Sequence, residues 1–97
     1  MIRIVKMTFE LEAIPTFLET FEHYKDKIRN QPGCQYLELI QGIDSPQIIM
    51  TYSHWNAPED LEKYRQSDLF KEVWKLTKMH FSDRPEAWSL DSKYSLK

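Results

Sequence analysis

The fold is decided by the stretch CQYLELIQGIDSPQIIMTYSHW, residues 34–55. Residues 34–41 and 47–55 are rich in aromatic, β-branched and other apolar residues, which favour strands. The residues between them, 42–46, include glycine, aspartate, serine and proline, which are typical of turns. The pattern predicts two antiparallel strands joined as a hairpin.

The residues before this hairpin predict a strand followed by a helix. Residues 2–9 alternate apolar and β-branched residues with polar ones, as a half-buried strand does. Over residues 14–29 the apolar positions recur every three or four residues, which places them on one helical face. Pro15 suits a first helical turn, and the segment 30–33 ends the helix because it contains Pro32, which lacks a backbone donor.

A second helical region follows the hairpin. Asn56 and Glu59 have the spacing of a capping box, so a helix is expected to begin near Pro58. The apolar helical face continues as far as Phe81, but Ser67 can cap a new turn. We therefore expect this element to break or kink near residues 66–67.

The end of the chain predicts one more strand. Residues 82–85 contain a proline and end the second helical region, and residues 87–90 predict the strand. The element order β-α-β-β-α-β is the split βαβ arrangement of ferredoxin-like folds. The sequence thus predicts an α+β fold in which a four-stranded antiparallel sheet carries the helices on one face. A single domain spanning residues 1–97 is expected, with a core over about 2–90 and a tail over 91–97.

Consecutive apolar residues suggest that both faces of this sheet are covered. They occur at residues 48–50, 39–40 and 4–5, where a sheet with one face in water would alternate with polar residues. The helices can cover one face, and little of the 97 residues is left for the other. We expect a homodimer packed sheet to sheet, which forms a dimeric α-β barrel; the alternative is a few tolerated apolar residues on the surface.

Composition excludes several classes of protein. Fifteen acidic residues against 13 basic ones give a net charge of −2, which argues against nucleic acid as a partner. Cys34 is the only cysteine, which excludes an intrachain disulfide and a thiolate zinc site. No apolar run approaches the roughly 18 residues of a membrane span, and no signal peptide is evident, so no membrane contact and a cytoplasmic location are expected.

The motifs of common cofactor sites are absent. The chain has two glycines, so a glycine-rich phosphate or dinucleotide loop cannot form, and we expect no cofactor and no metal. His54, near the end of a predicted strand, is the candidate general base because its pKa lies near neutrality. The alternative is a half-exposed histidine at a strand end, without a catalytic role.

Aromatic residues line the predicted inner face of the second helical region. Most of these rings should simply form core, together with aromatic residues of the first helix. So many large rings can also leave a slot that holds a flat aromatic ligand. The rings are Tyr64, Phe70, Trp74 and Phe81 on the second helical region, and Phe17, Phe21 and Tyr24 on the first.

The segment Trp55-x5-Leu61-x2-Tyr64-x2-Ser67-Asp68-x-Phe70, preceded by Pro32-Gly33-Cys34, resembles the antibiotic biosynthesis monooxygenase family of dimeric α-β barrels. The resemblance covers about residues 1–90. It implies a βαββαβ protomer and a dimer packed through the sheets. Some members of that family are cofactor-free oxygenases of phenols or quinols, others degrade heme, and many have no known activity.

Residue by residue, the resemblance argues against heme degradation. Heme-degrading relatives place Asn, Trp and an iron-binding His at the positions that match Met7, Tyr64 and Trp74, and all three differ here. Trp74 cannot ligate iron. The remaining expectation is a cofactor-independent monooxygenase of a small aromatic substrate, with Tyr64, Trp74, Phe70 and Met7 binding the substrate. His54 would be the base if its side chain points to the helix side. The alternative is a non-catalytic small-molecule-binding or stress-related dimer.

Overall fold

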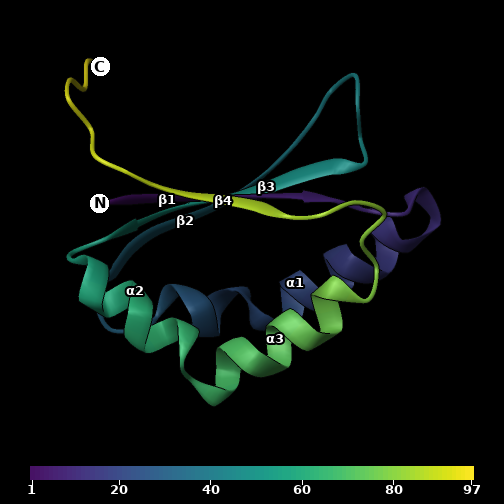
Figure 1. The fold of residues 1–97 in the computed structure, drawn as a ribbon, viewed down its shortest axis with the longest axis horizontal. Coiled ribbons are helices and arrows are strands. Elements are labelled where there is room, and N and C mark those ends of the chain that lie inside the picture. The colour runs from purple at the N-terminus through teal and green to yellow at the C-terminus, as the bar shows by residue number, and fades with distance from the viewer.

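The computed structural model describes all 97 residues as two layers, a sheet with the helices on one of its faces (Figure 1). This arrangement confirms the predicted α+β, ferredoxin-like fold. None of the helices combines the length and the apolar character that crossing a membrane requires. In chain order the elements are β1 (Ile2–Thr8), the 3-10 turn η1 (Leu11–Ala13), α1 (Ile14–Arg29), β2 (Cys34–Gln41), β3 (Ile48–Trp55), α2 (Pro58–Arg65), α3 (Asp68–Lys78) and β4 (Glu86–Leu90).

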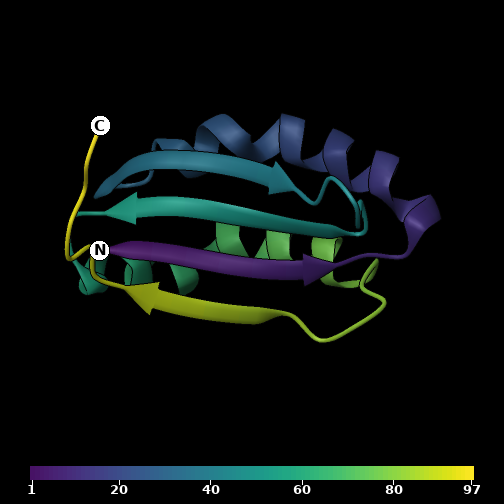
Figure 2. The same ribbon diagram turned by 90° about the horizontal axis from the view of Figure 1, so that it is seen from above.

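The sheet is antiparallel throughout, in the order β2-β3-β1-β4, with β1 and β3 at its centre (Figure 2). The register places Arg3 of β1 between Ser53 of β3 and Ser89 of β4. Residues directly opposite one another share a face of the sheet. The register therefore decides which side chains meet the helices.

One face of the sheet packs against the helices and the other carries no element of this chain. Met7, Ile49 and Trp55 are buried on the helix side. The opposite face, called the outer face below, is largely apolar or aromatic. It carries Ile2, Ile4, Lys6, Thr8, Tyr36, Glu38, Ile40, Ile48, Met50, Tyr52, His54, Glu86, Trp88 and Leu90. A second copy on this face stays a prediction.

The core between the layers consists of two clusters. One gathers around Trp55 and Tyr64 near the β3–α2 connection, and the other around Phe9 and Ile49 at the far end of the sheet. Phe21 of α1 packs against both clusters. The two clusters leave room between them, and the candidate site lies there.

The break in the second helical region is confirmed. The Ser67 hydroxyl accepts a hydrogen bond from the backbone N–H of Phe70 (3.1 Å) and donates one to the carbonyl of Tyr64 (2.6 Å). One side chain thus ends α2 and begins α3. The predicted capping box is wrong, because Ala57 is the N-cap of α2 and no side chain caps this helix. Asn56 instead donates its backbone N–H to the carbonyl of Gly33 (2.8 Å).

Replacing Ser67 with alanine should lower the free energy of unfolding by about 1 kcal/mol, because α3 loses its cap. Urea denaturation followed by circular dichroism measures this change. Ser67→Asn, which keeps an acceptor at the N-cap, is the matched control and should lose less stability. An alanine variant as stable as the wild type would contradict the capping role.

Candidate functional site

A cavity of about 220 Å³ lies between the sheet and the helices. Its floor is the helix face of β1 and β3, and its walls come from α1, α2 and α3. Pro85, just before β4, and Ala87 of β4 also line the cavity. Thirteen of its 20 lining residues are hydrophobic, so the cavity favours an apolar or aromatic ligand.

Four of the five residues predicted for the site line this cavity: Met7, Tyr64, Phe70 and Trp74. The rings of Tyr64 and Phe70 meet edge to face with centroids 5.2 Å apart. Phe70 and Trp74 stack at 5.9 Å with an angle of 11° between their planes. Met7 is buried in the floor of the cavity. Their role in substrate binding remains a prediction.

His54 lies on the outer face, so the condition set for its role as base, a side chain on the helix side, is not met. Its Nε2 is 3.0 Å from the Tyr52 hydroxyl, and its ring meets the Tyr36 ring edge to face at 5.6 Å. The alternation along β3 causes this placement, because neighbouring Ser53 and Trp55 point to the helices. The sheet separates the imidazole from the cavity, and His54 cannot reach a ligand there within one protomer.

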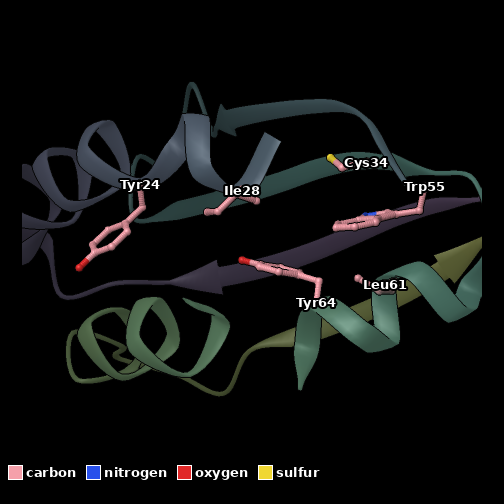
Figure 3. Packing of buried hydrophobic residues seen from close by; sticks show 6 residues of the cluster. All are labelled: Tyr24, Ile28, Cys34, Trp55, Leu61 and Tyr64. Carbon is pink, nitrogen blue, oxygen red and sulfur yellow. The ribbon is translucent and has the colours of Figure 1, made fainter. Parts of the chain in front are cut away.

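The Tyr64 hydroxyl is a polar group with no hydrogen-bond partner in the protein. Tyr64 is only 9% exposed, and its ring stacks on Trp55 at 5.5 Å. Figure 3 shows the hydroxyl directed away from Trp55 and Leu61, into the interior of the layer. Burial, and to a smaller extent the Cys34 thiol, raises the pKa of Tyr64 above its ordinary value. The phenol therefore stays protonated at neutral pH and can donate a hydrogen bond to a ligand oxygen.

Most other polar groups along the cavity already have partners. The Ser53 hydroxyl accepts from the Trp55 indole N–H (2.9 Å) and donates to the carbonyl of Arg3 (3.4 Å). The Thr77 hydroxyl donates to the carbonyl of Val73 (2.7 Å). These two hydroxyls already have partners within the fold, whereas the Tyr64 hydroxyl is free to donate to a ligand.

Two cavity residues that sequence patterns do not single out are Arg3 and Thr51. Arg3 shares the parity of Val5 and Met7 along β1, which faces the helices. Once Met7 is known to face the helices, this alternation predicts that Arg3 faces them too. Arg65, next to the aromatic motif, also lines the cavity.

Cys34 and the acidic residues do not form a further reactive centre. Burial raises the pKa of the Cys34 thiol, although the Tyr36 backbone and Arg29 oppose this shift. A thiol with a raised pKa is a weak nucleophile. No group of three or more His, Cys, Asp or Glu side chains lies close enough together to hold a metal ion.

The fold and the site define a class: a ferredoxin-like α+β domain with an aromatic cavity between its sheet and its helices. More specifically, residues 1–75 match the sequence model of the antibiotic biosynthesis monooxygenase family. The chain belongs to this family, as its motif around Tyr64 predicts. The family name indicates monooxygenase-type chemistry.

Solved structures show the same fold at low sequence identity. A proposed antibiotic biosynthesis monooxygenase from Nitrosomonas europaea has a TM-score of 0.89 and 13% identity, over 96% of this chain and 89% of that one. One from Bordetella bronchiseptica has a TM-score of 0.86 and 19% identity, over 96% of each chain. A conserved protein from Methanosarcina mazei Go1 has a TM-score of 0.83 and 23% identity, over 89% of this chain and 86% of that one. No curated protein sequence matches the chain.

Proposed function

We propose that the protein is a cofactor-independent monooxygenase that oxidises a small phenol or quinol with O₂. The observation that carries this proposal is the Tyr64 hydroxyl, which has no hydrogen-bond partner in the protein although the residue is only 9% exposed and lines a cavity of stacked aromatic rings. Such a cavity can hold a flat ring, and the Tyr64 hydroxyl can donate a hydrogen bond to the oxygen of a phenol. Membership of the family supports the reaction class.

The reaction needs no redox group from the protein. A phenol with O₂ gives a quinone and water: one oxygen atom enters the ring, the other leaves as water, and the substrate supplies all four electrons. The protein binds and orients the ring and excludes water. Tyr64 donates its proton in a hydrogen bond to the substrate oxygen and thereby favours the ionised substrate.

The ionised substrate is taken from solution, because the cavity offers no general base. His54 is on the outer face. Glu86 is among the residues that border the cavity, but it is opposite Lys6 in the register, and both residues belong to the outer face. The pH dependence of the rate should therefore follow the pKa of the substrate hydroxyl, and His54→Ala should leave it unchanged.

Oxygen consumption by the purified, metal-free protein tests the proposal. We expect uptake with members of a panel of dihydroxynaphthalenes, and a fall in kcat/KM of about tenfold or more in Tyr64→Phe, since a hydrogen bond to a charged oxygen is lost. Trp74→Ala should also reduce uptake, through loss of ring stacking. Tyr94→Phe is the matched control, because Tyr94 is 91% exposed. Uptake that is unchanged in Tyr64→Phe would exclude this role of the cavity.

A second function, binding without turnover, is favoured by the absence of a base beside Tyr64 in the cavity. Binding of the same naphthalenediols, measured by calorimetry, with no O₂ uptake would support this function over the oxygenase. No binding and no uptake would count against both.

We also propose that the protein is a homodimer joined through its outer faces. Three observations support this. Tyr36, Ile40 and Trp88 are exposed there, no element of this chain covers them, and most of the side chains on the face are uncharged. Large exposed apolar surfaces usually mark an interaction site.

A further inference from the structure

Two arginines lie together at one end of the cavity. Arg3, on the helix face of β1, is half-buried, and Arg65 lies in the last turn of α2. Both line the cavity, and with Leu61 both also line a second, more polar pocket that adjoins it. The two side chains therefore lie where the two pockets meet.

Arg3 carries a charge that no side chain of this protein neutralises. Its one hydrogen bond is from Nη1 to the neutral Ser89 hydroxyl (3.1 Å), and it forms no ion pair. A guanidinium has five N–H donors, so most of them are free. Burial, and then the charge of Arg65, lower the pKa of Arg3, while Glu62 opposes the shift. Free guanidinium donors in the wall of a cavity can bind an anionic group of a ligand.

None of the nearby carboxylates forms an ion pair with Arg3. Glu62 pairs with Arg65 at 3.3 Å near the surface of α2. Glu86 lies on the outer face with Lys6, and Asp91 is an exposed residue at the edge of the second pocket. Arg3 therefore has no carboxylate partner among these side chains.

We propose that the ligand of this cavity is a small aromatic carboxylate whose acid group binds Arg3, assisted by Arg65, while its ring lies among the cavity aromatics. The inference rests on the proposed function, in that the same cavity is the binding site. Arginine binds carboxylates in a two-pronged geometry. A volume of 220 Å³ is below the roughly 300 Å³ at which drug-sized ligand sites begin, so the ligand has one or two rings.

The geometry also orients such a ligand. Leu61, like the two arginines, lines both pockets, and the Tyr64 hydroxyl points away from Leu61 toward the interior. With its carboxylate on Arg3, the ligand would present its inner edge to Tyr64. A hydroxyaromatic acid satisfies both ends, with the acid at the arginines and the hydroxyl at Tyr64.

A pair of ligands that differ only in charge tests the inference. Calorimetry should show that 2-naphthoate binds at least about tenfold more tightly than the neutral 2-naphthamide, since a hydrogen bond to a charged group is at stake. Arg3→Gln should abolish this preference, Arg3→Lys should keep part of it, and Arg65→Gln should reduce it. Arg84→Gln, in the exposed segment before β4, is the control and should keep the preference intact.

The outcomes separate this inference from the oxygenase proposal. Equal binding of the acid and the amide, or no binding of either, overturns the inference, whether or not neutral naphthalenediols drive O₂ uptake. A preference for the acid that survives in Arg3→Gln also overturns it. A preference for the acid that depends on Arg3, without O₂ uptake, supports the inference and counts against the oxygenase.

Discussion

Replacing Phe9 with alanine should lower the free energy of unfolding by about 3–5 kcal/mol. Phe9 is 0% exposed, and its ring contacts Phe17 at 4.3 Å and Phe81 at 5.3 Å. These three rings join the end of β1 to α1 and to the segment after α3. A domain of this size has a total stability of roughly 5–15 kcal/mol, so the loss is a large part of the whole.

Urea denaturation at a fixed protomer concentration measures this effect, because the stability of the proposed dimer would depend on concentration. Leu11→Ala is the matched control, since Leu11 is an apolar residue close in sequence that is 57% exposed, and it should change stability by about 0.5 kcal/mol or less. A loss below about 1 kcal/mol in Phe9→Ala, with an unchanged denaturant slope, would show that the ring is not part of a well-packed core.

Replacing Trp88 with glutamate should convert the proposed dimer to a monomer. Trp88 is 41% exposed and faces outward from β4, opposite Ile4 of β1. In a two-fold interface each copy contributes the same patch, so one substitution places two charges in it. A buried charge without a partner is strongly unfavourable, whereas the same charge in water has little effect on the protomer.

Light scattering after size-exclusion chromatography should give a mass near 11.7 kDa for Trp88→Glu and about twice that for the wild type. Leu11→Glu, which adds the same charge away from the sheet, should keep the mass of the dimer. Circular dichroism shows whether both variants stay folded. A monomeric wild type, or a dimer that tolerates Trp88→Glu, would contradict an interface on the outer face.

Local patterns in the sequence were sufficient for most of the fold. The hairpin of residues 34–55 and the helix over 14–29 were predicted from alternation, helical spacing and turn residues, and the structure has them at nearly the same bounds. Ser67 was identified as a cap because its chemistry is local. At Asn56 a local rule failed, since a backbone contact with Gly33 from another part of the chain determines the conformation there.

The candidate site was harder to predict because it depends on which face of each strand meets the helices. Alternation shows that His54 and Tyr52 share a face, but it does not say which one. The burial of Trp55 and Ile49 decides it, and that burial follows from tertiary packing. Arg3 was missed for the same reason, because an arginine in a strand is expected to face water until its register with Ser53 is known.

The cavity between the two core clusters lowers the stability of the fold. Empty volume in a protein interior destabilises by about 24 cal/mol per Å³, so a fully dry void of 220 Å³ would correspond to at most about 5 kcal/mol. Bulkier side chains at its walls would remove much of that loss without altering the fold. Proteins commonly give up stability where activity demands it. The cavity thus lowers the free energy of unfolding and leaves space for the proposed ligand. A ligand that binds only the folded chain would raise the free energy of unfolding again.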